Sequence, residues 1–142
     1  MQVFPTSPEV IYNTLVADAT FMAEIGTYEW TSGGSAVPAI GIVTPGDDLP
    51  ATRNVQGIEC VIHDMGHTRR QDYYNSVNVF KDWSVYLICW APASGEGVNI
   101  AVDRMLSLFR GSTSMEVVAV SDGLGARAQA LVTVPSEFPI IS

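Results

Sequence analysis

The sequence predicts a single α+β domain over residues 1–142, with one mainly antiparallel sheet and two helices packed on one of its faces. Three observations support this prediction. A length of 142 residues suits one domain with a buried core. Apolar residues recur at helical spacing near the start of the chain and again at 95–110. Extended segments with alternating apolar residues lie between and after these two stretches, and successive strands without intervening helices favour antiparallel pairing.

The opening segment TSPEVIYNTLVADATFMAEIG is predicted to form a helix with a break. Ser7 is a favourable N-cap residue for its start. Asp18 interrupts the apolar face, and we interpret it as the N-cap of a second short helix over 19–25, which Gly26 then ends as a C-terminal glycine. The apolar face of the whole segment consists of Ile11, Leu15, Met22 and Ile25.

Several strands are expected before the second helix. A short strand is predicted in TYEWTS, another at about 39–44, and a third in VQGIECVIHDM, with Ile58, Cys60 and Ile62 on one face. A long strand follows at 77–90. It is expected to pair with the third strand as a hairpin, with 65–76 as the connection or as flaring strand tips. Its apolar residues of shared parity, interrupted only by Lys81, are Val77, Val79, Trp83, Val85, Leu87 and Cys89.

The second helix is predicted in SGEGVNIAVDRMLSLFRGS, and Gly111 follows it as the residue after the C-cap. Its apolar stripe consists of Val98, Ala101, Val102, Met105 and Phe109. The strands MEVVAVS and ARAQALVTVP are expected to close the domain as a hairpin, joined by the turn sequence DGLG.

Charge and hydropathy argue against two classes of partner. The net charge is −8, with fifteen acidic residues and seven basic ones, whereas tight nonspecific DNA binding needs clustered Lys and Arg. No stretch of eighteen apolar residues predicts a membrane span, and the N-terminus does not resemble a secretory signal. The cytoplasm of the producing cell is therefore the expected site of synthesis.

The stretch HDMGHTRRQDYYN, residues 63–75, looks at first like an active site. His63 and His67 are four residues apart, a spacing that binds zinc when both lie on one helix. Here the flanking residues predict strand and turn, and the glutamate of the metalloprotease motif is missing. We therefore favour a polar hairpin tip over a metal site.

The other candidate catalytic groups also have simpler interpretations. Cys60 and Cys89 lie in apolar runs and are expected to be buried free thiols, although a disulfide between adjacent strands stays open. Asp47 and Asp48 are adjacent in a loop, which is typical of solvated turn residues. Nucleotide-binding motifs are absent. The sequence therefore predicts no enzymatic activity, no cofactor and no metal.

The polar stretch and the C-terminal tail are better candidates for assembly surfaces. Tyr and Arg are enriched at protein interfaces, and apolar residues on a loose chain end often dock onto a neighbour. We favour this interpretation over single-stranded nucleic-acid binding because the chain is acidic. The interface candidates are His67, Arg69, Arg70, Asp72, Tyr73, Tyr74, Phe138, Ile140 and Ile141.

The layout of the chain resembles that of the tail terminator (tail completion) proteins of long-tailed bacteriophages. The resemblance lies in the opening helix VIYNTLVADATFMAEIG, the proline-preceded strand VPAIGIV, the long strands with a polar connection, the helix GVNIAVDRMLSLFRG and the closing hairpin. These pieces cover most of the chain in order. The family has no residue-level signature that can be carried over to individual positions.

This resemblance implies a structural virion protein without an active site. Terminators assemble into a homohexameric ring that caps the tail tube and joins it to the neck, so the expected partners are other copies of the chain, the tail tube protein and a neck or connector protein. Residues 63–75 would form a projecting arm that contacts a neighbouring subunit or the tube, and the tail SEFPIIS could dock on an adjacent protomer. Asp47 and Asp48 would help to line a channel that DNA crosses without specific binding. The expected location is the tail–neck junction of the virion, after synthesis in the host cytoplasm.

Two alternatives stay open. The chain could be another neck, connector or minor tail component, since such proteins are also small, acidic and ring-forming. It could instead be a small metal- or ligand-binding enzyme domain that uses His63, Asp64 and His67. The metal content of the purified protein would separate the enzyme from the structural proteins.

Overall fold

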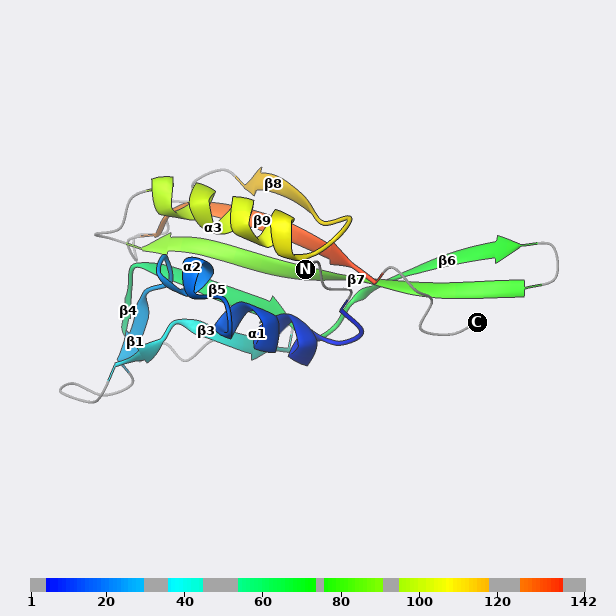
Figure 1. Ribbon diagram of the computed structural model, residues 1–142, viewed down its shortest axis with the longest axis horizontal. Helices are drawn as coiled ribbons and strands as arrows, with labels where there is room; N and C mark the ends of the chain where they lie inside the picture. Colours follow the sequence, from blue (N-terminus) through cyan, green and yellow to red (C-terminus); the bar gives the residue numbers. More distant parts are fainter. Residues whose placement is uncertain are drawn as a thin grey trace.

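The computed structural model describes residues 5–29, 36–44, 54–73, 76–90, 95–117 and 126–136. Three helices and nine strands lie within these residues, and Figure 1 shows their arrangement. In chain order they are α1 (Pro8–Val16), α2 (Ala19–Met22), β1 (Thr27–Glu29), β2 (Val37–Pro38), β3 (Ile40–Val43), β4 (Asn54–Gln56), β5 (Ile58–His63), β6 (His67–Tyr73), β7 (Ser76–Trp90), α3 (Gly95–Leu108), β8 (Thr113–Val117) and β9 (Ala126–Pro135).

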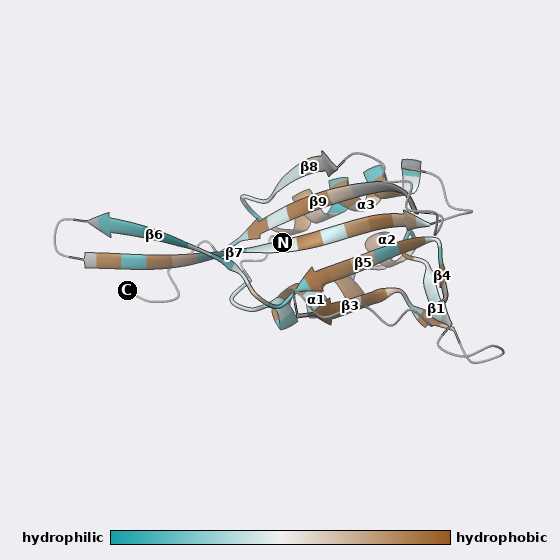
Figure 2. Ribbon diagram, turned by 180° about the vertical axis from the view of Figure 1, so that it is seen from behind, coloured by the Kyte–Doolittle hydropathy of each residue, from teal (hydrophilic) through white to brown (hydrophobic). Residues whose placement is uncertain are grey.

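The predicted α+β class is confirmed. The main sheet has the strand order β3-β5-β7-β9-β8, and β6 pairs with β7 outside this path. All three helices lie on one face of this sheet, as predicted for the helical segments (Figures 1 and 2). The strand β7 is central because it pairs antiparallel with β5, β6 and β9.

Two features of the sheet differ from the prediction. β3 runs parallel to β5, so the main sheet, predicted to be mainly antiparallel, contains one parallel pair. A separate small sheet with the order β2-β1-β4 also forms. Both features involve the short strands β1 to β4. Strands of this length carry too little sequence pattern to reveal which strands they pair with.

The caps of the opening helices follow the sequence prediction. The Ser7 side chain accepts a hydrogen bond from the Val10 amide at 3.4 Å, and α1 begins at Pro8. Asp18 caps α2 by accepting from the amides of Thr20 and Phe21 at 3.0 and 3.2 Å. The second helix is shorter than expected, because it ends at Met22 instead of Ile25.

Gly26 was predicted to end the second helix as a C-terminal glycine, and this prediction was wrong. Among the described residues, only Gly57 and Gly111 have a positive φ, so Gly26 is not a left-handed helix terminus. A Cβ atom at Gly26 would instead lie 1.8 Å from the carbonyl oxygen of Gln56. The glycine is therefore needed for a close approach between two backbone segments. Gly111 does have a positive φ, of 75°, but it lies three positions after Leu108, the last residue of α3, and not directly after the C-cap as predicted.

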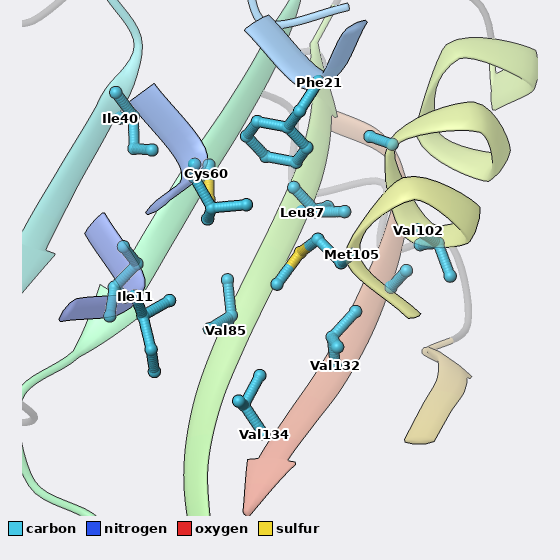
Figure 3. Close-up of a cluster of buried hydrophobic side chains, with 14 of the residues drawn as sticks. Ile11, Phe21, Ile40, Cys60, Val85, Leu87, Val102, Met105, Val132 and Val134 are labelled. Carbon is cyan, nitrogen blue, oxygen red and sulfur yellow. The ribbon is translucent and has the colours of Figure 1, made fainter. Parts of the chain in front are cut away.

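A single hydrophobic core lies between the helices and the sheet (Figure 3). The apolar stripe predicted for the second helix is buried in this core, and so are the inward residues of the long central strand from Trp83 onwards. Members contributed by the helices and by the facing strands include Ile11, Phe21, Met105, Cys60, Val85, Leu87, Val132 and Val134. None of the helices in the described part of the chain is long and apolar enough to cross a bilayer.

Candidate assembly surface

A two-stranded arm extends from one end of the main sheet (Figures 1 and 2). We define the arm as residues 67–82, which comprise β6 and the first part of β7. The pairing of its strands runs from His67 with Asp82 to Tyr73 with Ser76. The connection that the sequence suggested as a loop or as flaring tips is therefore mainly a regular antiparallel hairpin.

The arm begins at a bend between β5 and β6. Both strands pair with β7, but residues 63–66 stand opposite only residues 83–84 of β7, so the strand bulges outward. Asp64 attaches this bulge to β3: its amide donates to the carbonyl of Val43 at 3.0 Å, and its carboxylate accepts from the hydroxyl of Thr44 at 2.8 Å. The bulge is therefore held to the body while β6 continues beyond it.

Gly66 lets the bulge pass close to the central strand. A Cβ atom there would lie 3.1 Å from Trp83 Nε1 and 3.1 Å from Lys81 Cδ. Trp83 is buried, so the arm starts where the hydrophobic core ends.

Beyond this point the arm has no third strand among the described residues. The pairing of β9 with β7 stops at Pro135 opposite Asp82. β6 pairs with no described strand except β7. An isolated two-stranded hairpin is at best marginally stable in water, and its outer edges present unpaired backbone groups. The arm therefore leaves strand edges open among the described residues.

One face of the arm combines a cation with an aromatic ring. Arg69 is opposite Phe80, and its guanidinium carbon lies 4.7 Å from the ring centroid. Arg69 Nε also lies 3.5 Å from Asp82 Oδ2. The other oxygen of Asp82 is buried and has no hydrogen-bond partner in the described part of the chain.

The opposite face of the arm is partly apolar. Val77 and Val79 are paired with Asp72 and Arg70, and Val77 is 39% exposed. Arg70 Nε lies 2.8 Å from Asp72 Oδ1, but both side chains are largely exposed, so this ion pair adds little stability. This face therefore presents valines to the solvent without a covering layer in the described residues.

The two histidines do not form a shared site. His63 lies at the end of β5, with its ring centroid 4.9 Å from that of Tyr86. Partial burial lowers the pKa of His63, and the Asp64 carboxylate only partly opposes this effect. His67 is exposed and begins β6, beyond the bulge. Within the described residues, no three His, Cys, Asp or Glu side chains gather in an arrangement that could hold a metal ion.

The expectation that HDMGH forms a hairpin tip was wrong. It forms the bend at the base of the arm, because β6 begins at His67 and continues to Tyr73. The arm candidates His67, Arg69, Arg70 and Asp72 do lie together on this hairpin, and Tyr73 ends β6. The remaining candidates lie outside the described residues: Tyr74, Asp47, Asp48, Phe138, Ile140 and Ile141.

The prediction of buried free cysteines is confirmed. Cys60 and Cys89 are both buried and unbridged. Burial, together with the adjacent Glu59 carboxylate, raises the pKa of the Cys60 thiol far above its ordinary value. A protonated thiol is a poor nucleophile, so Cys60 is suited to packing and not to catalysis.

Glu59 is a buried carboxylate whose partners the sequence did not reveal. Its two oxygens accept hydrogen bonds from the Tyr28 hydroxyl at 2.6 Å and from Trp90 Nε1 at 3.1 Å. Because Tyr28 belongs to β1 and Glu59 to β5, this contact joins the small sheet to the main sheet. Its role in the structure is to hold these two sheets together.

The sheet face opposite the helices carries a transverse apolar row that sequence reasoning missed, because its residues alternate with the core residues of the same strands. Val61, Tyr86, Leu131 and Met115 are register neighbours on β5, β7, β9 and β8. Met115 is 60% exposed. In the third predicted strand, VQGIECVIHDM, Val55 and Val61 are apolar residues on the face opposite Ile58, and they could have indicated this row. The row ends on β8, which is the edge strand of the sheet.

No model of a known protein family, no curated protein and no solved structure matches this chain.

Proposed function

We propose that the protein is a structural subunit that assembles with copies of itself into a ring, and that this ring acts as a phage tail terminator. In this role the ring caps the tail tube, stops its growth and joins it to a neck protein. The observation that carries the proposal is the arm, which extends past the hydrophobic core and has no third strand among the described residues.

The distribution of charge supports self-assembly. The arm carries Arg69, Arg70 and Lys81 against Asp72 and Asp82, so its net charge is +1. Since the whole chain has a net charge of −8, the rest of it carries −9. Opposite charges favour the docking of an arm on the body of another subunit over the docking of two bodies on each other.

The same charge distribution suits a ring that DNA crosses. An acidic body repels the phosphate backbone, so DNA would pass through the channel without adhering to its wall. The proposed partners are therefore the tube protein and the neck protein, with DNA present only in passage. The proposed location is the tail–neck junction of a virion.

The direct test has two stages. Electron microscopy of the negatively stained protein should show rings with a central channel. These rings, added to polymerising tail tube subunits, should bind tube ends and shorten the mean tube length. The control is a variant in which the dipeptide Asn-Gly replaces residues 71–78. Asn-Gly then forms a two-residue turn between Arg70 and Val79, which are paired in the native hairpin.

This variant removes the distal arm but keeps the contact of Arg69 with Phe80 and Asp82. We expect it to remain folded and to lose both ring formation and tube capping. Rings that leave tube length unchanged would contradict the terminator role and favour another connector component.

A further inference from the structure

The strand β8 forms an open edge of the main sheet. β8 pairs with β9 and with no other described strand. It contains neither proline nor lysine, the residues that commonly prevent an edge strand from pairing with another chain. Thr113, Ser114 and Met115 are all exposed. β8 therefore offers unpaired backbone groups together with an accessible apolar side chain.

The arm presents the matching element. Along residues 76–80, the edge of β7 that faces away from β6 has no described strand beside it, because β9 ends opposite Asp82 and Ser136 bonds no further than Lys81. Both this segment and the five-residue β8 are long enough to form a regular ladder. Val77 and Val79 on the arm resemble Met115 on β8 in being partly or largely exposed apolar residues.

The two edges cannot meet within one molecule. β9 lies between β7 and β8 in the sheet, and the arm extends away from the body along β7 (Figure 1). A contact between them therefore requires a second copy. The net charges of the arm and the remainder of the chain, +1 and −9, favour such a copy as the partner.

We propose that the arm of one subunit adds as a strand to the β8 edge of the next subunit, so that residues 76–80 of β7 extend the neighbour's main sheet. Main-chain hydrogen bonds would hold the added strand, and the exposed valines would pack beside Met115. This inference rests on the self-assembly part of the proposed function and names the two surfaces that meet.

The contact has a consequence for the symmetry of the assembly. It joins two different surfaces, the arm of one subunit and β8 of the next, and is therefore heterologous. Repetition of such a contact generates a closed ring when the rotation between subunits closes, and a filament otherwise. An arm that reaches a neighbour's edge thus accounts for a ring without any two-fold contact.

Cysteine cross-linking in the full chain tests the proposal. Asn78→Cys on the arm and Ser114→Cys on β8 are introduced into the same chain, which is then treated with a short bismaleimide. The native thiols Cys60 and Cys89 are buried and should not react. A head-to-tail contact should produce a ladder of covalent oligomers on a denaturing gel, and the ladder should end at the number of subunits in the ring.

The matched control places the second cysteine elsewhere on the body. Asn99→Cys lies on the exposed side of α3, and its combination with Asn78→Cys should give about ten-fold less ladder. Each single cysteine variant should stop at the dimer. Met115→Lys should raise the concentration of half-assembly by about ten-fold, because a lysine on the edge strand opposes pairing.

The outcomes separate the contact from the proposed function. A ladder from N78C with S114C, weaker with N99C and reduced by M115K, supports strand addition at β8. Light scattering that shows assembled protein, combined with a ladder no stronger than the N99C control, overturns the β8 contact and leaves self-assembly standing. A monomer at all concentrations, with no ladder, overturns both.

Discussion

Ser136 holds the main chain of Lys81 by two hydrogen bonds at the point where the arm leaves the body. The Ser136 amide donates to the Lys81 carbonyl at 2.7 Å, and the Lys81 amide donates to the Ser136 hydroxyl at 2.9 Å. Ser136 is buried and directly follows β9. The side chain thus continues the ladder for one residue past the end of β9 and fixes the base of the arm.

Ser136→Ala should loosen this base. The Lys81 amide would lose its acceptor in a partly buried setting, which costs about 1–2 kcal/mol of unfolding free energy. Amide hydrogen exchange at Lys81 should accelerate, while exchange at Val85 in the core of β7 should change only as much as the loss of global stability requires. Ser107→Ala is the control, because the Ser107 hydroxyl is exposed and donates only to the carbonyl of Arg104. Equal exchange at Lys81 in both variants would show that Ser136 does not hold the arm.

Asp18→Asn should make the protein less sensitive to acid. Burial alone would raise the pKa of Asp18, but hydrogen bonds from Arg104 and from the amides of Phe21 and Thr20, with the charge of Arg104, hold it below its ordinary value. A lowered carboxyl pKa adds stability above the unfolded-state value, and this stability is lost as the pH falls through the folded-state value. The free energy of unfolding of the native protein, measured with denaturant, should therefore fall below about pH 4.

Asparagine is also a good N-cap, so D18N isolates the contribution of the charge. At pH 7 we expect a loss of about 1 kcal/mol, because the partner guanidinium is partly exposed and 2.6 Å from the carboxylate. The difference between D18N and the native protein should shrink toward low pH. A difference that stays constant between pH 7 and pH 3 would contradict the ion pair as its cause.

Gly26→Ala should destabilise the fold by about 2 kcal/mol or more, because the added methyl would overlap the carbonyl oxygen of Gln56. Gly41→Ala is the matched control, since nothing lies within 4 Å of a Cβ at Gly41. That variant should be neutral or slightly stabilising. Thermal unfolding followed by circular dichroism compares the two, and equal midpoints would refute the close approach of the two backbone segments.

The predictable parts of the fold are those with a long or repeated local signal. The caps at Ser7 and Asp18, the stripe of the second helix and the period-two pattern of the central strand were all readable, because each depends on neighbouring residues. The parallel pairing of β3 with β5 was not readable. This pairing depends on which distant strand forms hydrogen bonds with residues 40–43, and the sequence of a four-residue strand does not indicate its partner.

The candidate site was predictable in composition but not in shape. The tyrosines and arginines of residues 67–74 predicted an interface. The regular hairpin was not predictable, because β6 carries polar side chains on both of its faces and so shows no apolar alternation. Lys81 marked the position where the arm begins, because it interrupts the alternating apolar residues of the central strand there. The partners of Glu59 come from strands far apart in the sequence, so no local pattern could have shown them.

The native mass of the purified protein, measured by light scattering over a range of concentrations, tests whether the chain assembles through its arm. We expect a discrete oligomer, near six times 15.3 kDa for a hexamer, in the native chain. The variant with Asn-Gly in place of residues 71–78 should have the mass of a folded monomer. A native chain that stays monomeric throughout, or an oligomer that persists unchanged without the distal arm, would contradict the account.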